Sequence, residues 1–157
     1  MLNLDKIDCL LLSELQINAR VANAELARRL NLSPPAVHAR VRRLEEQELI
    51  RGYVALLDRE RLGFDMLCFI QITLQLHQPD QVAHFRTTIQ QTPEVLECHH
   101  VTGEYDYLLK VAVRNRQELE QVVMHKLTPI PGVARIHTSL VFSEIKTSTA
   151  LPLAGSV

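Results

Sequence analysis

The sequence predicts an α+β protein with two unlike parts, and two observations lead to this prediction. In the first part of the 157 residues, apolar side chains recur with the 3.6-residue period of amphipathic helices. From Met66 onward, segments that alternate with the two-residue period of half-buried strands are interspersed with helical segments. The period changes after a polar stretch that contains Gly63, which is the expected domain boundary.

The composition is that of a folded chain. Hydrophobic residues make up 46% of it and charged residues 22%, which excludes intrinsic disorder. Neither a signal peptide nor a membrane span is expected, and we therefore expect a cytoplasmic protein. The three cysteines, Cys9, Cys68 and Cys98, are widely spaced, so they predict reduced thiols rather than a disulfide framework.

Two short helices are predicted near the N-terminus. Asp5 is a typical N-cap residue for the first, whose apolar side chains Ile7, Leu11 and Leu15 share one face. The second begins near Asn23 and continues through Leu30, with an acidic residue in its first turn, where the helix dipole favours negative charge.

A third helix is predicted from Ser33 to Gln47, because an N-cap serine precedes a proline at the first helical position. Val37, Val41 and Leu44 form an apolar stripe that would face the core. The opposite face carries Pro35, His38, Ala39 and Arg42, and Arg40 and Arg43 flank it.

Two helices, a three-residue turn and a third helix predict a helix-turn-helix, whose last helix suits the DNA major groove. Net charge is −1, but six basic residues and one acid lie between Arg20 and Arg43. Local positive charge of this kind is what contact with phosphates requires. Alternating apolar residues over 49–57 predict a strand, paired as a small wing, that brings Arg51 near the DNA backbone.

The second part predicts the order β-α-β-β-α-β, a ferredoxin-like sandwich. Its two helices would cover one face of an antiparallel sheet, and the apolar residues on the other face would be covered by another subunit. The predicted boundaries are a DNA-binding domain at 1–58, a linker at 59–65, the sandwich at 66–147 and a flexible tail at 148–157.

Two long segments resemble one family. LSPPAVHARVRRLEEQELIRGYVAL resembles the DNA-binding domain of Lrp/AsnC (feast/famine) transcription regulators, and ECHHVTGEYDYLLKVAV with the later Ile130–Val133 is similar to their effector domain. The resemblance is strongest to the leucine-responsive branch. It implies a regulator that binds double-stranded promoter or operator DNA and associates with the nucleoid. It also implies a homodimer that assembles further, to an octamer by preference, and whose oligomer geometry and promoter binding change when a free amino acid, leucine or methionine, binds between C-terminal domains.

The resemblance also carries over individual residues. Positions that match the recognition helix near DNA are Ser33, Pro35, His38, Arg42 and Arg43. Positions that match the effector site are Thr102, Gly103, Glu104, Tyr105, Asp106, Thr138 and Ser139, with His100 beside the loop. The chain departs from the family at Ala22, where serine often caps the second helix and Asn23 would have to replace it. It also departs at Ser139, where a larger aromatic residue is common.

The chemistry of these residues suggests their roles. Arg42 is assigned to a base, because its guanidinium fork matches guanine O6 and N7. Arg40, Arg43 and Arg51 are assigned to phosphates, with a salt bridge inside the domain as the alternative for Arg40. His38 would contact DNA or simply be exposed, and both readings stay open.

The loop at 102–106 would recognise the groups that all amino acids share. Gly103 allows backbone N–H groups to approach a carboxylate, and Asp106 could accept hydrogen bonds from an α-ammonium group. The alternative is an ordinary hairpin turn with a solvated acid. Cys98, His99 and His100 predict no metal site, since neighbouring strand residues face opposite sides and no further ligands complete a set.

Two other functions are alternatives to an amino-acid-responsive regulator. An enzyme on the ferredoxin-like domain is disfavoured, because no nucleophile–base pair, phosphate-binding glycine motif or pair of catalytic acids is present, and no cofactor is expected. An architectural protein that compacts DNA without an effector remains open. A change of melting temperature with free amino acids distinguishes it from a regulator.

Overall fold

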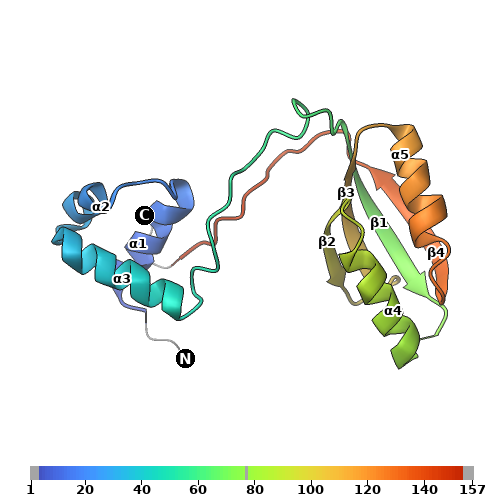
Figure 1. The fold of residues 1–157 in the computed structure, drawn as a ribbon, viewed down its shortest axis with the longest axis horizontal. Coiled ribbons are helices and arrows are strands. Elements are labelled where there is room, and N and C mark those ends of the chain that lie inside the picture. The colour runs from blue at the N-terminus through green and yellow to red at the C-terminus, as the bar shows by residue number, and fades with distance from the viewer. Residues whose placement is uncertain (1–3, 77, 154–157) are drawn as a thin grey trace. The chain divides into compact units, whose positions relative to one another are not determined.

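A computed structural model describes residues 4–76 and 78–153. The chain divides into two compact units (Figure 1). The helical unit contains the residues up to Leu56 together with those from Lys146 onward, and the sheet unit contains 57–145. The chain therefore passes from the helical unit to the sheet unit and returns.

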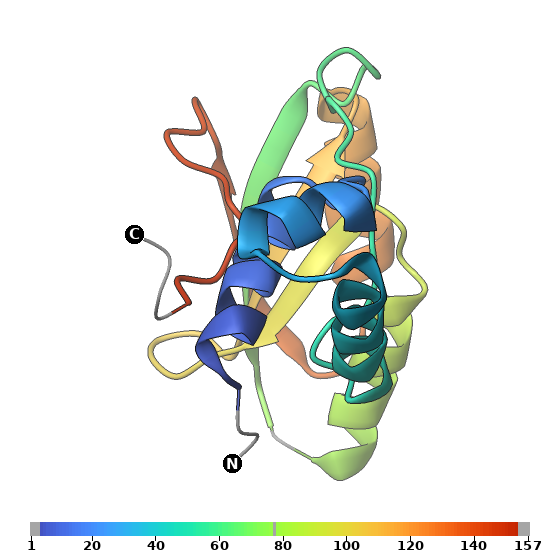
Figure 2. The same ribbon diagram turned by 90° about the vertical axis from the view of Figure 1, so that its left-hand side faces the viewer.

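The helical unit contains α1 (Lys6–Ile17), α2 (Asn23–Leu30) and α3 (Pro34–Glu46), coloured blue to teal in Figure 2. Asp5 caps α1 in a reciprocal capping box with Asp8, and Ser33 caps α3 by accepting a hydrogen bond from Ala36 N. These two caps and the helix-turn-helix order confirm the prediction.

The start of α2 differs from the expectation. Its N-cap is Ala22, which makes no side-chain hydrogen bond, and Asn23 is already the first helical residue. Asn23 therefore does not replace the missing serine. The end of α2 is better defined, because Asn31 adopts the left-handed conformation (φ 54°) that asparagine tolerates and begins the turn to α3.

The segment 49–57 was predicted to be a strand in a small wing. This prediction is wrong for the single chain, in which none of these residues is in a strand. The segment's apolar side chains Val54 and Leu56 are exposed, with Leu56 83% accessible. A strand requires a neighbouring backbone to complete its hydrogen bonds, and the described residues supply none there. Tyr53 is held by α3 instead: its hydroxyl donates to Glu45, 2.9 Å away, and burial with this contact raises the pKa of Tyr53 to about 12.

The sheet unit confirms the βαββαβ order. It comprises β1 (Met66–Leu74), α4 (Pro79–Gln90), β2 (Val95–His100), β3 (Tyr107–Val113), α5 (Arg116–Glu120) with η1 (Gln121–Leu127), and β4 (Val133–Leu140). The strands are antiparallel in the order β2-β3-β1-β4. Figure 1 shows α4 and α5 on the same face of this sheet. The core of this unit lies between the sheet and these helices. Phe85 of α4 is fully buried there, and its ring centroid is 4.4 Å from that of Tyr107.

The last helix of the sheet unit has two parts, α5 and η1. Asn115 is the N-cap and accepts a hydrogen bond from Glu118 N. From Gln121 onward, however, the helix is π-helical, and Thr128 N donates to Val123 O five residues back. The spacing of the buried residues Val122 and Leu127 explains the change, because a five-residue interval places both on the core side only in this wider turn.

Gly132 provides a prediction about stability. Its φ is +89°, and a Cβ added there would lie 2.5 Å from Oε1 of Gln81 on α4. Gly132→Ala is therefore expected to lower the free energy of unfolding by about 1–3 kcal/mol, measured by urea denaturation. Gly63→Ala is the control, since Gly63 has a similar φ of +81° with nothing within 4 Å. An equal loss in both variants would contradict a role for Gln81.

The C-terminal segment returns to α1. The backbone N–H of Leu151 donates to Oε1 of Gln16 (2.6 Å), and Nε2 of Gln16 donates to the carbonyl of Leu151 (3.1 Å). Part of the segment expected to be a flexible tail is thus grouped with the helical unit. Residues 154–157 of that expectation lie outside the described residues.

Two further findings concern the whole described chain. Within 4–76 and 78–153, no helix is long and apolar enough to cross a membrane. The three cysteines are free thiols, as predicted, and burial raises the pKa of Cys68 in the sheet core.

Candidate functional site

The recognition helix α3 presents the predicted face. Val37 and Leu44 are fully buried with Leu11 and Leu26 of the neighbouring helices. On the opposite side, Pro35, His38, Ala39 and Arg42 are exposed. The amphipathic pattern thus separates a core-facing stripe from a polar stripe that is free to approach DNA.

Arg42 has the most exposed side chain of the three arginines in α3. Its side chain is 71% exposed, and its Nε donates to Glu46, 2.8 Å away and itself 62% exposed. Ion pairs between exposed side chains one helical turn apart contribute little, so Arg42 can exchange this partner for a base. Arg51, in the extended segment after α3, is exposed and has no ion pair with any described residue.

Arg40 and Arg43 are placed differently from Arg42. Both donate to Asp8 on α1, Arg40 at 2.7 Å and Arg43 at 2.5 Å, and Arg40 also donates to Asp5 at 2.7 Å. The salt bridge that was the alternative for Arg40 is therefore present. The backbone N–H of Asp8 and the guanidinium of Arg40 lower the pKa of Asp5.

Other charges of the basic segment are paired as well. Arg28 and Arg29 of α2 both bind Glu25, and Arg29 also binds Glu14 of α1 at 2.5 Å. Hydrogen bonds from these two arginines lower the pKa of Glu25 to about 2. The positive charge that the sequence displays is therefore largely compensated inside the helical unit.

The predicted effector loop connects β2 and β3. Gly103 turns there with φ +128°, a conformation that favours glycine. The carboxylate of Asp106 accepts a hydrogen bond from Leu74 N at the end of β1, 2.7 Å away, and Asp106 N donates to the carbonyl of Ile72. Asp106 thus fastens the loop to the central strand.

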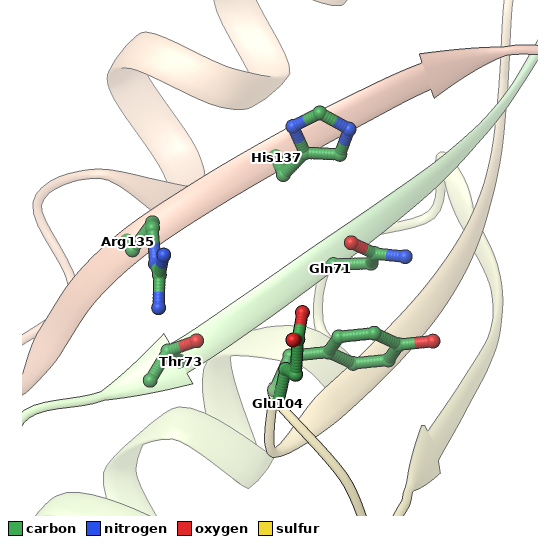
Figure 3. Close-up of a pocket in the computed structure, with 6 residues that line it drawn as sticks. Gln71, Thr73, Glu104, Arg135 and His137 are labelled. Carbon is green, nitrogen blue, oxygen red and sulfur yellow. The ribbon is translucent and has the colours of Figure 1, made fainter.

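A pocket of about 260 Å³ lies beside this loop. It is lined by Gln71 and Thr73 of β1, Arg135 and His137 of β4, and Glu104 and Tyr105 of the loop. Figure 3 shows the labelled side chains gathered over one face of the two strands, with the loop at the edge. The pocket therefore contains both signs of charge, a neutral amide, two hydroxyls and an imidazole.

The strand register explains which predicted residues line the pocket. His137 is opposite Gln71 and Arg135 is opposite Thr73, so their side chains share the sheet face that α4 and α5 leave open. Thr138 is opposite buried Ile70 and therefore lies on the helix-covered face. Of the predicted effector residues, Glu104 and Tyr105 line the pocket.

Three predicted effector residues lie on strands of this sheet but do not line the pocket. Ser139 is opposite Phe69 on the open face. Thr138 is on the other face, as is His100, whose ring stacks on Tyr107 at 4.9 Å. Sequence reasoning missed Gln71, Thr73, Arg135 and His137, because the pairing of β1 with β4 brings them together from distant segments.

In the segment Cys98–His100, neighbouring side chains face opposite sides of the sheet, as predicted. Cys98 and His100 are opposite buried Leu109 and Tyr107, whereas His99 is on the other face, where its Nε2 lies 3.1 Å from Glu97. Among the residues that the structure describes, no group of three or more histidine, cysteine, aspartate or glutamate side chains could hold a metal ion.

Comparisons with known proteins identify the family. The family model for the AsnC-type helix-turn-helix domain matches residues 4–45, and that for the Lrp/AsnC ligand binding domain matches residues 67–151. The chain belongs to the Lrp/AsnC family. It is 42% identical over 149 residues to the leucine-responsive regulatory protein of Escherichia coli K12, covering 95% of this chain and 91% of that protein.

Solved structures of Lrp/AsnC regulators agree with this assignment. A transcriptional regulator of Neisseria meningitidis in complex with L-methionine is 36% identical, with a TM-score of 0.93 over 97% of this chain and 98% of that one. The feast or famine regulatory protein of M. tuberculosis, also complexed with L-methionine, is 32% identical, with a TM-score of 0.86 over 95% and 99%. This Lrp/AsnC protein is a DNA-binding transcription regulator and not an enzyme.

Proposed function

We propose that this Lrp/AsnC regulator changes its oligomer geometry and promoter binding when a free amino acid, leucine or methionine, binds to its C-terminal domain. The observation that carries the proposal is the match of residues 67–151 to the family's ligand binding domain. Two relatives of the same fold were solved with L-methionine, and another relative is named for leucine.

The proposed effector site combines the loop at 102–106 with the adjoining pocket. An amino acid is a zwitterion, so its recognition needs a donor for the carboxylate and an acceptor for the ammonium group. Arg135 and Glu104 supply these opposite charges at one pocket, and Gly103 leaves the loop backbone uncovered. His100, Thr138 and Ser139 stay in the proposal as residues that a ligand between subunits would reach.

The proposed DNA contacts follow the exposed side of α3. Ser33, Pro35, His38 and Arg42 lie along it, and Arg51 follows on the extended segment. Arg42 is proposed to read a base and Arg51 to bind a phosphate. Because a transcription regulator must bind promoter DNA, we propose that the protein is cytoplasmic and associated with the nucleoid.

A homodimer that assembles to an octamer is part of the proposal. The open sheet face includes Phe69, which is exposed, and the extended segments carry further apolar side chains, among them Val54 and Phe142. Exposed apolar surface of this extent is typical of protein–protein contacts. Multiple weak DNA contacts in one oligomer would also compensate for the modest charge of each helical unit.

The experiment that tests the function is a melting-temperature panel of the full chain with each of the twenty amino acids. A ligand at 100 times its Kd stabilises the folded state by about 2.7 kcal/mol, which corresponds to a rise of roughly 5–10 °C for a chain of this length. We expect this rise with leucine or methionine and not with their D-enantiomers. Light scattering on the positive samples measures the oligomer. No shift with any amino acid would favour the architectural alternative.

A further inference from the structure

Asp8 is a buried carboxylate in the helical unit. Its side chain is 1% exposed, and its two oxygens are bound from the recognition helix. Arg40 Nη1 donates to Oδ1 at 2.7 Å, and Arg43 Nη2 donates to Oδ2 at 2.5 Å. A buried acid with both oxygens engaged by arginines of one helix fixes that helix in position, because a shift of α3 would leave the charge unpaired.

The position of Asp8 is itself fixed by the start of α1. Asp8 N donates to Oδ1 of Asp5 at 2.7 Å, and Asp5 N donates to Oδ2 of Asp8 at 3.2 Å. This capping box holds the carboxylate at the first turn of a helix, where the dipole also favours negative charge. Asp5 then provides Arg40 with a second acceptor at 2.7 Å.

The geometry of α3 separates its three arginines. Arg40 and Arg43 are three residues apart and therefore share one flank of the helix, the flank that meets α1. Arg42 lies on the exposed stripe with Pro35 and His38. Only the first two arginines are tied to another helix among the described residues.

We propose that Asp8 is a positioning residue for DNA recognition, which holds Arg40 and Arg43 on α1 so that α3 presents Arg42 to the bases. In this arrangement Arg40 and Arg43 do not bind phosphates. The inference rests on the proposed DNA-binding role of α3 and changes the assignment that the sequence suggested for these two arginines.

The charge balance supports the inference. The two arginines face two aspartates, so the cluster of Asp5, Asp8, Arg40 and Arg43 has no net charge. A phosphate that approaches these guanidinium groups meets two carboxylates that already compensate their charge. Arg42, whose only acidic partner in the described chain is exposed Glu46, meets no such obstacle.

The salt dependence of DNA binding tests the assignment of the arginines. Each phosphate contact contributes a slope of about −0.9 to the plot of log K against log salt concentration. The probe is a fluorescent duplex selected by the full chain from a random-sequence library, with a mixed-sequence duplex for comparison. We expect Arg51→Gln to reduce the slope by about 0.9, and Arg40→Gln and Arg43→Gln to leave it unchanged while lowering the melting temperature.

Asp8→Asn tests the positioning role. It keeps the shape of the side chain but removes one of the two negative charges of the cluster, so that Arg43 loses its acidic partner and Arg40 keeps only Asp5. Binding to the mixed-sequence duplex is therefore expected to strengthen. The preference for the selected duplex is expected to fall about fivefold or more, the smaller end of what one arginine–guanine pair contributes. Asp5→Asn is the control, because Asp5 is exposed and binds only one of the two arginines, and because asparagine can still cap α1. It should change the preference less.

Each outcome has a defined meaning. A smaller salt slope in Arg40→Gln or Arg43→Gln, or equal losses on both duplexes in Asp8→Asn, would overturn the inference, since a merely structural role reduces both affinities together. If Asp8→Asn does not fold, the two arginine variants decide the matter. Failure of the unaltered chain to select any duplex would instead contradict the proposed DNA-binding function.

Discussion

Arg42→Ala is expected to weaken binding to a selected duplex by about 5- to 150-fold, or about 1–3 kcal/mol, because it removes a guanidinium fork that matches one guanine edge. Binding to mixed-sequence DNA should change much less, since base contacts and not phosphates would be lost. The side chain is exposed and its ion pair with Glu46 spans one helical turn at the surface, so the fold should be unaffected. Fluorescence anisotropy with the two duplexes measures both affinities.

Arg42→Lys is the control for charge. Lysine keeps the positive charge but cannot make the paired, planar hydrogen bonds of arginine. We expect Arg42→Lys to retain binding to mixed-sequence DNA and to lose most of the preference for the selected duplex. Equal losses on both duplexes in Arg42→Ala would show that this arginine binds a phosphate.

Asp106→Ala is expected to abolish the stabilisation by the amino-acid effector and to lower the free energy of unfolding by about 1–3 kcal/mol. The second effect follows from the structure, because the variant removes the acceptor of Leu74 N at 2.7 Å and leaves a partly buried donor unpaired. Binding to DNA without effector should change little. Calorimetric titration with the effector and urea denaturation measure the two effects separately.

Asp106→Asn separates recognition from structure. Asparagine retains a carbonyl oxygen that can accept the hydrogen bond from Leu74 N, but it lacks the negative charge that an α-ammonium group would prefer. If Asp106 contacts the effector, this variant should keep most of its stability and lose affinity for the amino acid. Unchanged affinity would mean that Asp106 only fastens the loop to β1.

The parts of the fold that depend on local patterns could be predicted from the sequence. Ser33 and Pro34 mark the start of α3, and the spacing of Val37 and Leu44 identifies its buried face. In the sheet unit, segments of two-residue period that are interspersed with helical segments predicted the order of strands and helices. Local hydrogen bonds and side-chain periods determine these features, and both are visible in one sequence.

The parts that depend on pairing between distant segments could not be predicted. The pocket residues Arg135 and Thr73 meet because β4 pairs with β1 in one register, which the alternation of each strand alone does not specify. Arg43 binds Asp8, which lies 35 positions earlier in the sequence. The sequence alone does not show this ion pair, so Arg43 was assigned to a DNA phosphate. The segment 49–57 has a strand pattern without a partner strand, and a pattern alone does not supply one.

The affinity of the full chain for its selected duplex, measured with and without leucine or methionine, tests the central claim most directly. If the C-terminal domain senses an amino acid and the helix-turn-helix reads DNA, one of these amino acids will change the affinity by about 5-fold or more, the usual range of coupling between sites. The Asp106→Asn chain should bind the same duplex with no such change. An affinity that is identical with and without every amino acid, while DNA binding itself is intact, would contradict the claim.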